Sequence, residues 1–280
     1  MSAPFARDCF ARLPYRGFHP RFLRRLEGLA DWPTPEQYDD LALAVPRAQG
    51  VQLPRFVTES RDALRRVGGY EQHVAQLCAV PSRPEHWHDF FNMSVWAHFP
   101  ELRWALNALH VDPTVGPKDA RNGRAPAQNV AATFDEAGML VVSTSRKVLE
   151  ALRALHFKRA FWEMREELQA TTRFWVVGHG LLESLLTPHA GLAARSLLLY
   201  VPTLQEPGQD DELRYEIDRA AAARVQAFRN TRTVLDPIPV LAIPGYSDNG
   251  SPDFFDDLRN IRFEPYSRRP SDANADLDSG

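Results

Sequence analysis

The sequence predicts an α+β fold that is mostly helical, with a small and mainly antiparallel sheet covered by helices. Amphipathic and capped helical patterns recur along the chain, whereas apolar runs typical of strands are few and short. These segments do not alternate as in repeated βαβ units, which argues against a Rossmann fold. No G-x-G-x-x-G, P-loop or G-x-S-x-G motif occurs, so the common nucleotide-binding and serine-hydrolase signatures are absent.

The composition is that of an ordinary globular chain without a strong charge imbalance. Of its 280 residues 44% are hydrophobic, which is enough for a substantial core. The 33 basic and 36 acidic residues give a net charge of −3. We therefore expect no positively charged surface for nucleic acid or for a membrane. Cys9 and Cys78 are too few for a disulfide framework. The N-terminus lacks the apolar core of a signal peptide, so we expect a cytoplasmic protein.

The N-terminal segment, residues 1–64, is expected to form short helices and loops that pack on the main domain. Its second helical stretch, "PEQYDDLALAV", begins with Thr34 as N-cap and Pro35 at the first helical position. The main α+β domain is expected to span residues 65–266 as a single unit. Residues 267–280 contain few apolar side chains and are predicted to be a disordered tail.

The segment "RPEHWHDFFN" is predicted to open a helix that runs from Arg83 to Phe99. Ser82 offers an N-cap and Glu85, three residues later, completes a capping box, with Pro84 in the first turn. Pro100 then ends the helix, because a proline disfavours helical geometry in the residue before it.

This helix carries a polar stripe on one face. At about 100° per residue, one arc contains Glu85, His88, Asp89, Asn92 and Trp96. The opposite face contains Trp87, Phe90 and Phe91. A helix this aromatic is expected to be largely buried, and buried polar groups need partners. Those partners are protein groups and water in a structural network, or a metal or substrate in a site, and the stripe alone leaves both open.

Downstream elements are predicted from turn residues and apolar runs. Residues 111–128 are rich in proline and glycine and resemble a loop. A β-hairpin is predicted in "NVAATFDEAGMLVVSTS", with "DEAG" as its turn. Two helical stretches follow between Arg146 and Thr171, and then the strands "RFWVVGHG" and "RSLLLYV". An amphipathic helix with acids in its first turn is predicted in "DDELRYEIDRAAAARVQAFRN".

Three polar elements lie in apolar surroundings and are expected to converge. They are the helix stripe, the hairpin turn with Asp135 and Glu136, and the strand end at His179, which Glu183 follows one turn later. If these side chains lie together, they can hydrogen-bond to one another and hold an ion. If each is buried alone, its burial costs free energy. We therefore predict that His88 and His179 approach each other, with Asp135 or Glu136 completing a cluster. The alternative is three independent hydrogen-bonded positions.

Two classes of function fit these residues. One is a metal-assisted hydrolase for a small phosphorylated or amide substrate, in which a divalent ion lowers the pKa of bound water and an acid acts as general base. The other is a non-enzymatic binding or adaptor protein whose polar cluster holds the fold. In the hydrolase, the predicted metal ligands are His88, Asp135 and His179, and the predicted catalytic residues are Asp89, Asn92, Glu136 and Glu183. Among the isolated histidines, His110 after "WALNAL" merits most attention. The oligomeric state is left open.

A family resemblance is carried by four segments of the chain, "YEQHVAQLCAVPSRPEHWHDFFNMSVWAHFPELRWALNALHV", "TFDEAGMLVVS", "FWVVGHGLLESLLTPHAGL" and "IPVLAIPGYSDNGSPDFFDD". In this order they resemble the blocks of a proteobacterial family of cytoplasmic proteins catalogued as a domain of unknown function. The resemblance covers residues 65–265. Its most specific part is Trp87, His88 and Asp89 together with Asn92.

The resemblance implies a bacterial, single-domain protein and no particular activity. In the family an aspartate often stands where this chain has Asn129, which puts a metal-binding carboxylate at that position in doubt. The polar positions of the family coincide with those singled out above, which favours a shared site. These positions are His88, Asp89, Asn92, Asp135, Glu136, His179 and Glu183.

Overall fold

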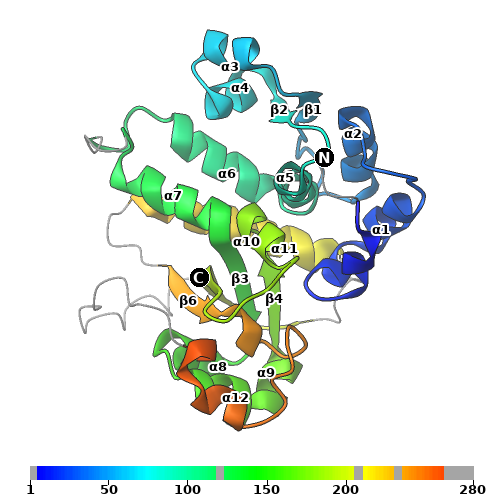
Figure 1. Cartoon of the computed structure of the whole chain (residues 1–280). Coiled ribbons are helices and arrows are strands. Elements are labelled where there is room, and N and C mark those ends of the chain that lie inside the picture. The colour runs from blue at the N-terminus through cyan, green and yellow to red at the C-terminus, as the bar shows by residue number, and fades with distance from the viewer. Residues whose placement is uncertain (1–4, 118–122, 205–210, 230–234, 262–280) are drawn as a thin grey trace.

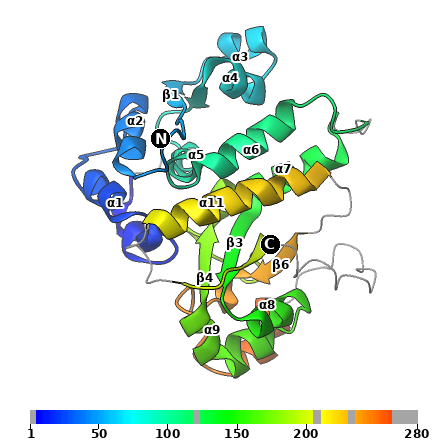
Figure 2. The same ribbon diagram turned by 180° about the vertical axis from the view of Figure 1, so that it is seen from behind.

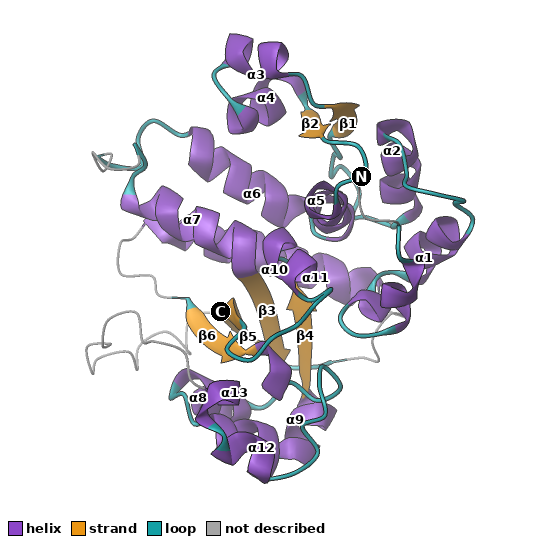
Figure 3. Ribbon diagram, in the orientation of Figure 1, coloured by secondary structure: helices purple, strands orange, loops and turns teal. Residues whose placement is uncertain are grey.

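The computed structural model describes residues 5–117, 123–204, 211–229 and 235–261. Most of this part of the chain is helical, and its strands form small sheets, as the sequence predicts (Figure 3). No helix among the described residues is both long and apolar enough to cross a membrane. The predicted disordered tail, residues 267–280, lies outside the described residues.

The first half of the chain contains the aromatic helix α5, which contacts α2, β2 and α6 among the elements of this half. The elements of this half are α1 (Pro20–Glu27), α2 (Pro35–Ala44), β1 (Arg55–Thr58), α3 (Arg61–Val67), α4 (Tyr70–Leu77), β2 (Ala79–Ser82), α5 (Trp87–His98) and α6 (Pro100–Val111). The second half contains α7 (Pro126–Ala137), β3 (Gly138–Ser143), α8 (Arg146–Arg153), α9 (Arg165–Thr171), β4 (Thr172–Val176), α10 (His179–Ser184), β5 (Ala193–Tyr200), α11 (Asp211–Gln226), β6 (Asp236–Pro239), α12 (Asp253–Asp256) and α13 (Leu258–Ile261).

Helices lie above and below the larger sheet. In Figure 1 the sheet lies between an upper layer that includes α7, α10 and α11 and a lower group that includes α8, α9 and α12. Seen from behind, α11 runs along α6, which it contacts (Figure 2). Asp218 on α11 accepts hydrogen bonds from the backbone amides of Glu101 (3.0 Å) and Leu102 (2.9 Å), so it satisfies the open N-terminal turn of α6. This contact fixes the helix that carries Arg103.

The larger sheet is mixed, so the expectation of a mainly antiparallel sheet is only partly right. Its strand order is β4-β3-β5-β6. β3 pairs antiparallel with β4 and β5 pairs antiparallel with β6, but the central pair of β3 and β5 is parallel. A parallel pair needs a long crossover, and the segment from α8 to α10 supplies it. A second, two-stranded sheet pairs β1 with β2 in parallel.

The N-terminal segment packs on the rest of the chain through aromatic side chains. Phe22 and Tyr15 are fully buried in the same hydrophobic cluster as Phe90 and Phe134. The hydroxyl of Tyr15 donates a 2.6 Å hydrogen bond to the backbone oxygen of Leu182, far along the sequence. The predicted Thr34 cap of α2 is confirmed, with its side chain accepting from the amide of Gln37. The proposed boundary at residue 64 stays a prediction.

The predicted capping box at the start of the aromatic helix is wrong. Ser82 is the last residue of β2, whose pairing with β1 keeps residues 79–82 extended. Glu85 has a positive φ of 52° and is exposed, and the helix begins only at Trp87. The strand therefore overrides the local capping signal, and Glu85 does not belong to the polar stripe.

The predicted hairpin around residues 129–145 is also wrong. A helix, α7, runs through this segment and ends at Ala137, so that "DEAG" is its last turn and the first residue of β3. Pro126 occupies the first turn, and the side chain of Gln128 accepts from the amide of Ala125 (2.9 Å). Buried positions at helical spacing, including Ala127, Ala131 and Phe134, turn one face of α7 to the core. Asp135 and Glu136 therefore project from a helix end.

Candidate metal centre

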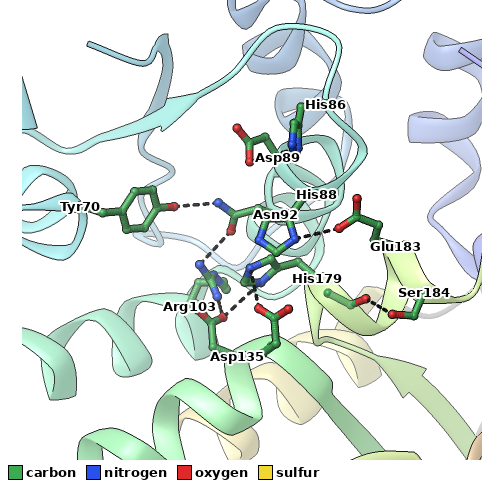
Figure 4. A network of polar contacts seen from close by, with 12 residues as sticks. Tyr70, His86, His88, Asp89, Asn92, Arg103, Asp135, His179, Glu183 and Ser184 are labelled. Carbon is green, nitrogen blue, oxygen red and sulfur yellow. Dashed lines mark hydrogen bonds and ion pairs between the residues drawn. The ribbon is translucent and has the colours of Figure 1, made fainter. Parts of the chain in front are cut away.

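Side chains from α5, α7 and α10 meet at one point, as the sequence predicts (Figure 4). The imidazole rings of His88 on α5 and His179 at the start of α10 lie edge to face, with ring centroids 4.3 Å apart. Glu136, from the last turn of α7, lies beside His179. The predicted approach of the two histidines is confirmed.

Glycines allow α7 and α10 to approach so closely. The carbonyl of Gly138 accepts hydrogen bonds from the amides of Val177 (3.0 Å) and Gly178 (2.8 Å), which ties the end of β4 to the end of α7. A Cβ at Gly178 would lie 2.2 Å from the backbone nitrogen of Gly138. A Cβ at Gly180 would lie 1.9 Å from Glu136 Oε1. In the sequence "GHG", Gly178 thus allows the backbone to pass close to the end of α7, and Gly180 leaves room for the side chain of Glu136.

The spacing of three side chains suits a single metal ion. The possible ligand atoms of His88, Glu136 and His179 all lie within 4.8 Å of one another. His179 Nε2 and Glu136 Oε2 are 3.5 Å apart. Two ligand atoms at about 2.1 Å from one ion, at a tetrahedral angle, are separated by about 3.4 Å. The observed separation matches that value, whereas it is long for a hydrogen bond.

Each histidine also faces a second carboxylate. His88 Nδ1 lies 3.0 Å from Glu183 Oε2. In the tautomer with a proton on Nδ1, this proton is donated to the carboxylate and Nε2 is left as a ligand atom. His179 Nδ1 lies 3.7 Å from Asp135 Oδ1. A hydrogen-bonded carboxylate such as Glu183 fixes the ring orientation and the tautomer of a metal-binding histidine, and Asp135 lies near the corresponding nitrogen of His179 at a longer distance.

Burial favours the neutral form of His179, and one of its ring nitrogens has no hydrogen-bond partner among the described residues. Burial, with help from the positive charge of Arg103, lowers the pKa of His179 to about 4. Its Nδ1 is buried and makes no hydrogen bond to any described residue. A buried polar atom without a partner is unusual, and a neutral imidazole is the form that binds metal ions.

A buried polar network supports the cluster from behind. Arg103 on α6 is 4% exposed, forms an ion pair with Asp135 and donates a 2.8 Å hydrogen bond to Asn92 Oδ1. Asn92 Nδ2 in turn donates to the hydroxyl of Tyr70 (2.7 Å). Asn92 therefore holds Arg103, and Arg103 holds Asp135 beside His179. Figure 4 shows this chain of contacts.

Asp89 belongs to the same helix face but has its own partner. Its carboxylate accepts hydrogen bonds from the backbone amide (2.6 Å), Nε (2.9 Å) and Nη2 (2.8 Å) of Arg83. These bonds hold the turn between β2 and α5. They also occupy both oxygens of the carboxylate, mostly with charged donors. Asp89 thus positions His88 by fixing the start of its helix.

The cluster opens into a pocket of about 1110 Å³. The triad of His88, Glu136 and His179 lies in its wall, and the side chain of Glu136 is 58% exposed. Asp89, Asn92 and Asp135 also line the pocket, whereas Glu183 lies behind His88. Sequence reasoning missed several polar side chains of this wall, among them Tyr70, Glu71, Arg103, Arg124 and Arg195. An arginine within the apolar helix "LRWALNAL" was the available signal, because a buried charge needs a partner.

Comparison with known proteins gives a family but no activity. A family model described as a protein of unknown function (DUF3025) matches residues 54–265. No curated protein matches the chain, and no solved structure matches it. The matched region contains all the residues of the triad and their carboxylate partners.

Proposed function

The chain belongs to a family of proteins of unknown function (DUF3025), and we propose from its own site that it is a metal-dependent hydrolase acting on a small-molecule substrate. The observation that carries this proposal is the separation of 3.5 Å between His179 Nε2 and Glu136 Oε2, in a triad whose possible ligand atoms all lie within 4.8 Å of one another. Both distances are explained by an ion that these side chains bind.

The proposed ligands are His88, Glu136 and His179. Two histidines and one carboxylate are the donor set of many catalytic zinc sites, which keep further positions open for water and substrate. Asp135 and Glu183 orient the two imidazoles. The sequence had suggested Asp135 as ligand and Glu136 as catalytic residue. The distances favour Glu136 as the ligand and Asp135 as the carboxylate beside His179 Nδ1.

Glu71 is the proposed general base. It lines the same pocket, and Asn107 donates a 2.7 Å hydrogen bond to its Oε2. Burial raises the pKa of Glu71 above its ordinary value. A carboxylate with a raised pKa takes up a proton from bound water more readily near neutral pH than an ordinary one. Asp89 is less suited, since Arg83 occupies both of its oxygens.

A non-enzymatic binding protein is the alternative. The contacts of Tyr70, Asn92, Arg103 and Asp135 form a connected network without any ion, and such a network can hold a fold on its own. In that case the stability of the protein does not depend on metal.

Hydrolysis assays after metal removal test the proposal. The full chain is treated with a chelator, reloaded with Zn²⁺, Mn²⁺ or Fe²⁺, and assayed against panels of phosphate esters and amides. We expect hydrolysis only in a metal-loaded form, with a loss of at least about 100-fold in Glu136→Gln. The matched control is Glu166→Gln, an exposed position on α9 that keeps full activity. Loaded, folded protein that hydrolyses no member of either panel favours the binding protein.

A further inference from the structure

A second pocket, of about 420 Å³, lies along the open edge of the larger sheet. β4 is an edge strand of this sheet, and every residue from Thr172 to Val176 lines the pocket. Side chains alternate between the two faces of a strand, so a pocket that all of them reach lies beside the edge of β4. Further walls come from the N-terminal segment, α5 and the start of α11. None of the described residues that line this pocket lines the pocket of the candidate metal centre.

The walls of this second pocket are mostly apolar. They include the side chains of Phe18, Phe99, Trp175, Leu182 and Ile243. The volume of about 420 Å³ falls within the range of small-molecule sites, which is roughly 300–1000 Å³. In such sites apolar walls bind the body of the ligand, and a few polar groups fix its orientation.

Arg173 on β4 presents an unoccupied pair of donors at this pocket. Its Nη1 donates to the backbone oxygens of Gln169 and Thr172, both at 3.0 Å, and these two residues also line the pocket. Its Nε is buried without a hydrogen-bond partner, and its Nη2 makes no hydrogen bond to any residue that the structure describes. A buried donor without a partner is costly, and a ligand can remove this cost.

The same donor pair of another arginine binds a carboxylate elsewhere in this chain. Arg83 donates from Nε (2.9 Å) and Nη2 (2.8 Å) to the two oxygens of Asp89. Nε and Nη2 lie on one edge of the guanidinium, and their parallel N–H bonds match the two oxygens of a carboxylate. Arg173 therefore has the geometry for a carboxylate that the described lining does not supply to it.

The charges of the pocket favour an anion without any metal. The described lining contains three arginines and one carboxylate, Asp211. Asp211 is already paired, since its Oδ1 lies 3.2 Å from Arg214 Nη2 and 3.3 Å from His19 Nε2. Arg16 is exposed, and its side chain makes no ion pair with any residue in the described part of the chain. Arg16 and Arg173 thus leave positive charge at the pocket.

We propose that this pocket binds a small carboxylic acid with an apolar body. The carboxylate accepts hydrogen bonds from Nε and Nη2 of Arg173, and Arg16 adds attraction at the exposed side. The apolar body lies against the aromatic and aliphatic walls. This site is separate from the candidate metal centre, and its ligand binds whether or not the chain is a hydrolase.

Calorimetric titration with octanoate tests the site. The full chain is titrated in the presence of a chelator, so that the carboxylate cannot bind through a metal. We expect saturable binding of one octanoate per chain. Acetate lacks the apolar body and octanol lacks the charge, so each should bind at least about tenfold more weakly than octanoate.

Two substitutions locate the carboxylate. Arg173→Lys keeps the positive charge but loses the paired donors, so we expect octanoate affinity to fall about tenfold or more. Arg16→Gln, at an exposed position, should lower the affinity about threefold at low ionic strength. The matched control is Arg65→Gln, whose arginine on α3 is 79% exposed and lies outside the lining, and it should bind octanoate as the unaltered chain does. Urea unfolding shows whether each variant is folded.

Four outcomes contradict the site. The unaltered chain shows no saturable binding of octanoate, or it binds octanol or acetate as tightly as octanoate. Folded Arg173→Lys binds octanoate as tightly as Arg65→Gln does. If Arg173→Lys does not fold, Arg16→Gln decides, and an affinity equal to that of Arg65→Gln at low ionic strength refutes the proposal.

Discussion

Gly178 and Gly180 flank His179, and the two glycines make different contacts. A Cβ on Gly178 would meet only backbone atoms, at 2.2 Å from Gly138 N and 2.6 Å from the backbone oxygen of Glu136. A Cβ on Gly180 would meet the end of the Glu136 side chain, which can rotate away. Gly178 is thus needed for the backbone to fold in this way, whereas Gly180 is needed for the position of Glu136, one of the proposed ligands.

Alanine at each glycine separates these two effects. Gly178→Ala is expected to lower the free energy of unfolding by about 1–3 kcal/mol or more, because backbone must move. Gly180→Ala is expected to change it by less than about 1 kcal/mol while weakening metal binding at least about tenfold, because Glu136 is displaced. Urea unfolding and metal titration measure the two quantities. Equal metal affinity in Gly180→Ala and the unaltered chain would remove Glu136 from the ligand set.

The buried imidazole of His179 predicts a pH dependence of stability. Burial lowers its pKa from 6.5 to about 4. Between these pH values the unfolded chain therefore binds a proton at His179 and the folded chain does not. Stability should therefore fall as the pH drops from 6.5 toward 4, by about 1–3 kcal/mol from this residue. In His179→Gln this part of the loss disappears, whereas His189→Gln, at an exposed position, retains it. Identical pH profiles for the metal-free unaltered chain and His179→Gln would contradict the assignment.

At the scale of elements, α4, α5 and α6 are joined by the bonds of Asn92. Its amide connects Tyr70 on α4 with Arg103 on α6, and Arg103 is almost fully buried. Removal of the amide leaves a buried guanidinium with one partner fewer, which costs more than the loss of a neutral hydroxyl bond.

Two substitutions compare these bonds. Asn92→Ala is expected to lower the free energy of unfolding by about 2–3 kcal/mol, and Tyr70→Phe by about 0.5–1.5 kcal/mol. Because Asn92 contacts both partners, the double variant should cost less than the sum of the two. Urea denaturation followed by circular dichroism gives all three values. Strict additivity would show that the two side chains act independently.

The sequence predicted where the elements meet better than it predicted the elements themselves. Helical periodicity placed His88 and Asn92 on one face, and the end of an apolar strand marked His179, so their meeting was foreseeable. The helix α7 was mistaken for a hairpin because "MLVVS" has strong strand character and "DEAG" resembles a turn. With that error, the roles of Asp135 and Glu136 could not be told apart. Neighbours on a helix point about 100° apart, and only the three-dimensional structure shows which one faces His179.

At the scale of the molecule, the hydrophobic cluster runs from the N-terminal helices to the sheet. It includes Tyr15 and Phe22 as well as Phe134 and Phe228, all fully buried. We therefore predict one cooperative unfolding transition, seen at the same denaturant concentration by tryptophan fluorescence and by circular dichroism. Trp32 and Trp87 report on the N-terminal part, and Trp175 reports on β4. Two separated transitions would divide the chain into independent units.

The most direct test of the central claim is the metal content of the folded chain. Protein stripped by a chelator is incubated with a divalent ion, desalted and analysed for bound metal, and its affinity is measured by titration. We predict one ion per chain, and an affinity at least about 100-fold lower in Glu136→Gln and His179→Gln than in the control Glu166→Gln. A folded chain that binds no ion, or variants that bind it as tightly as the control, would contradict the metal centre.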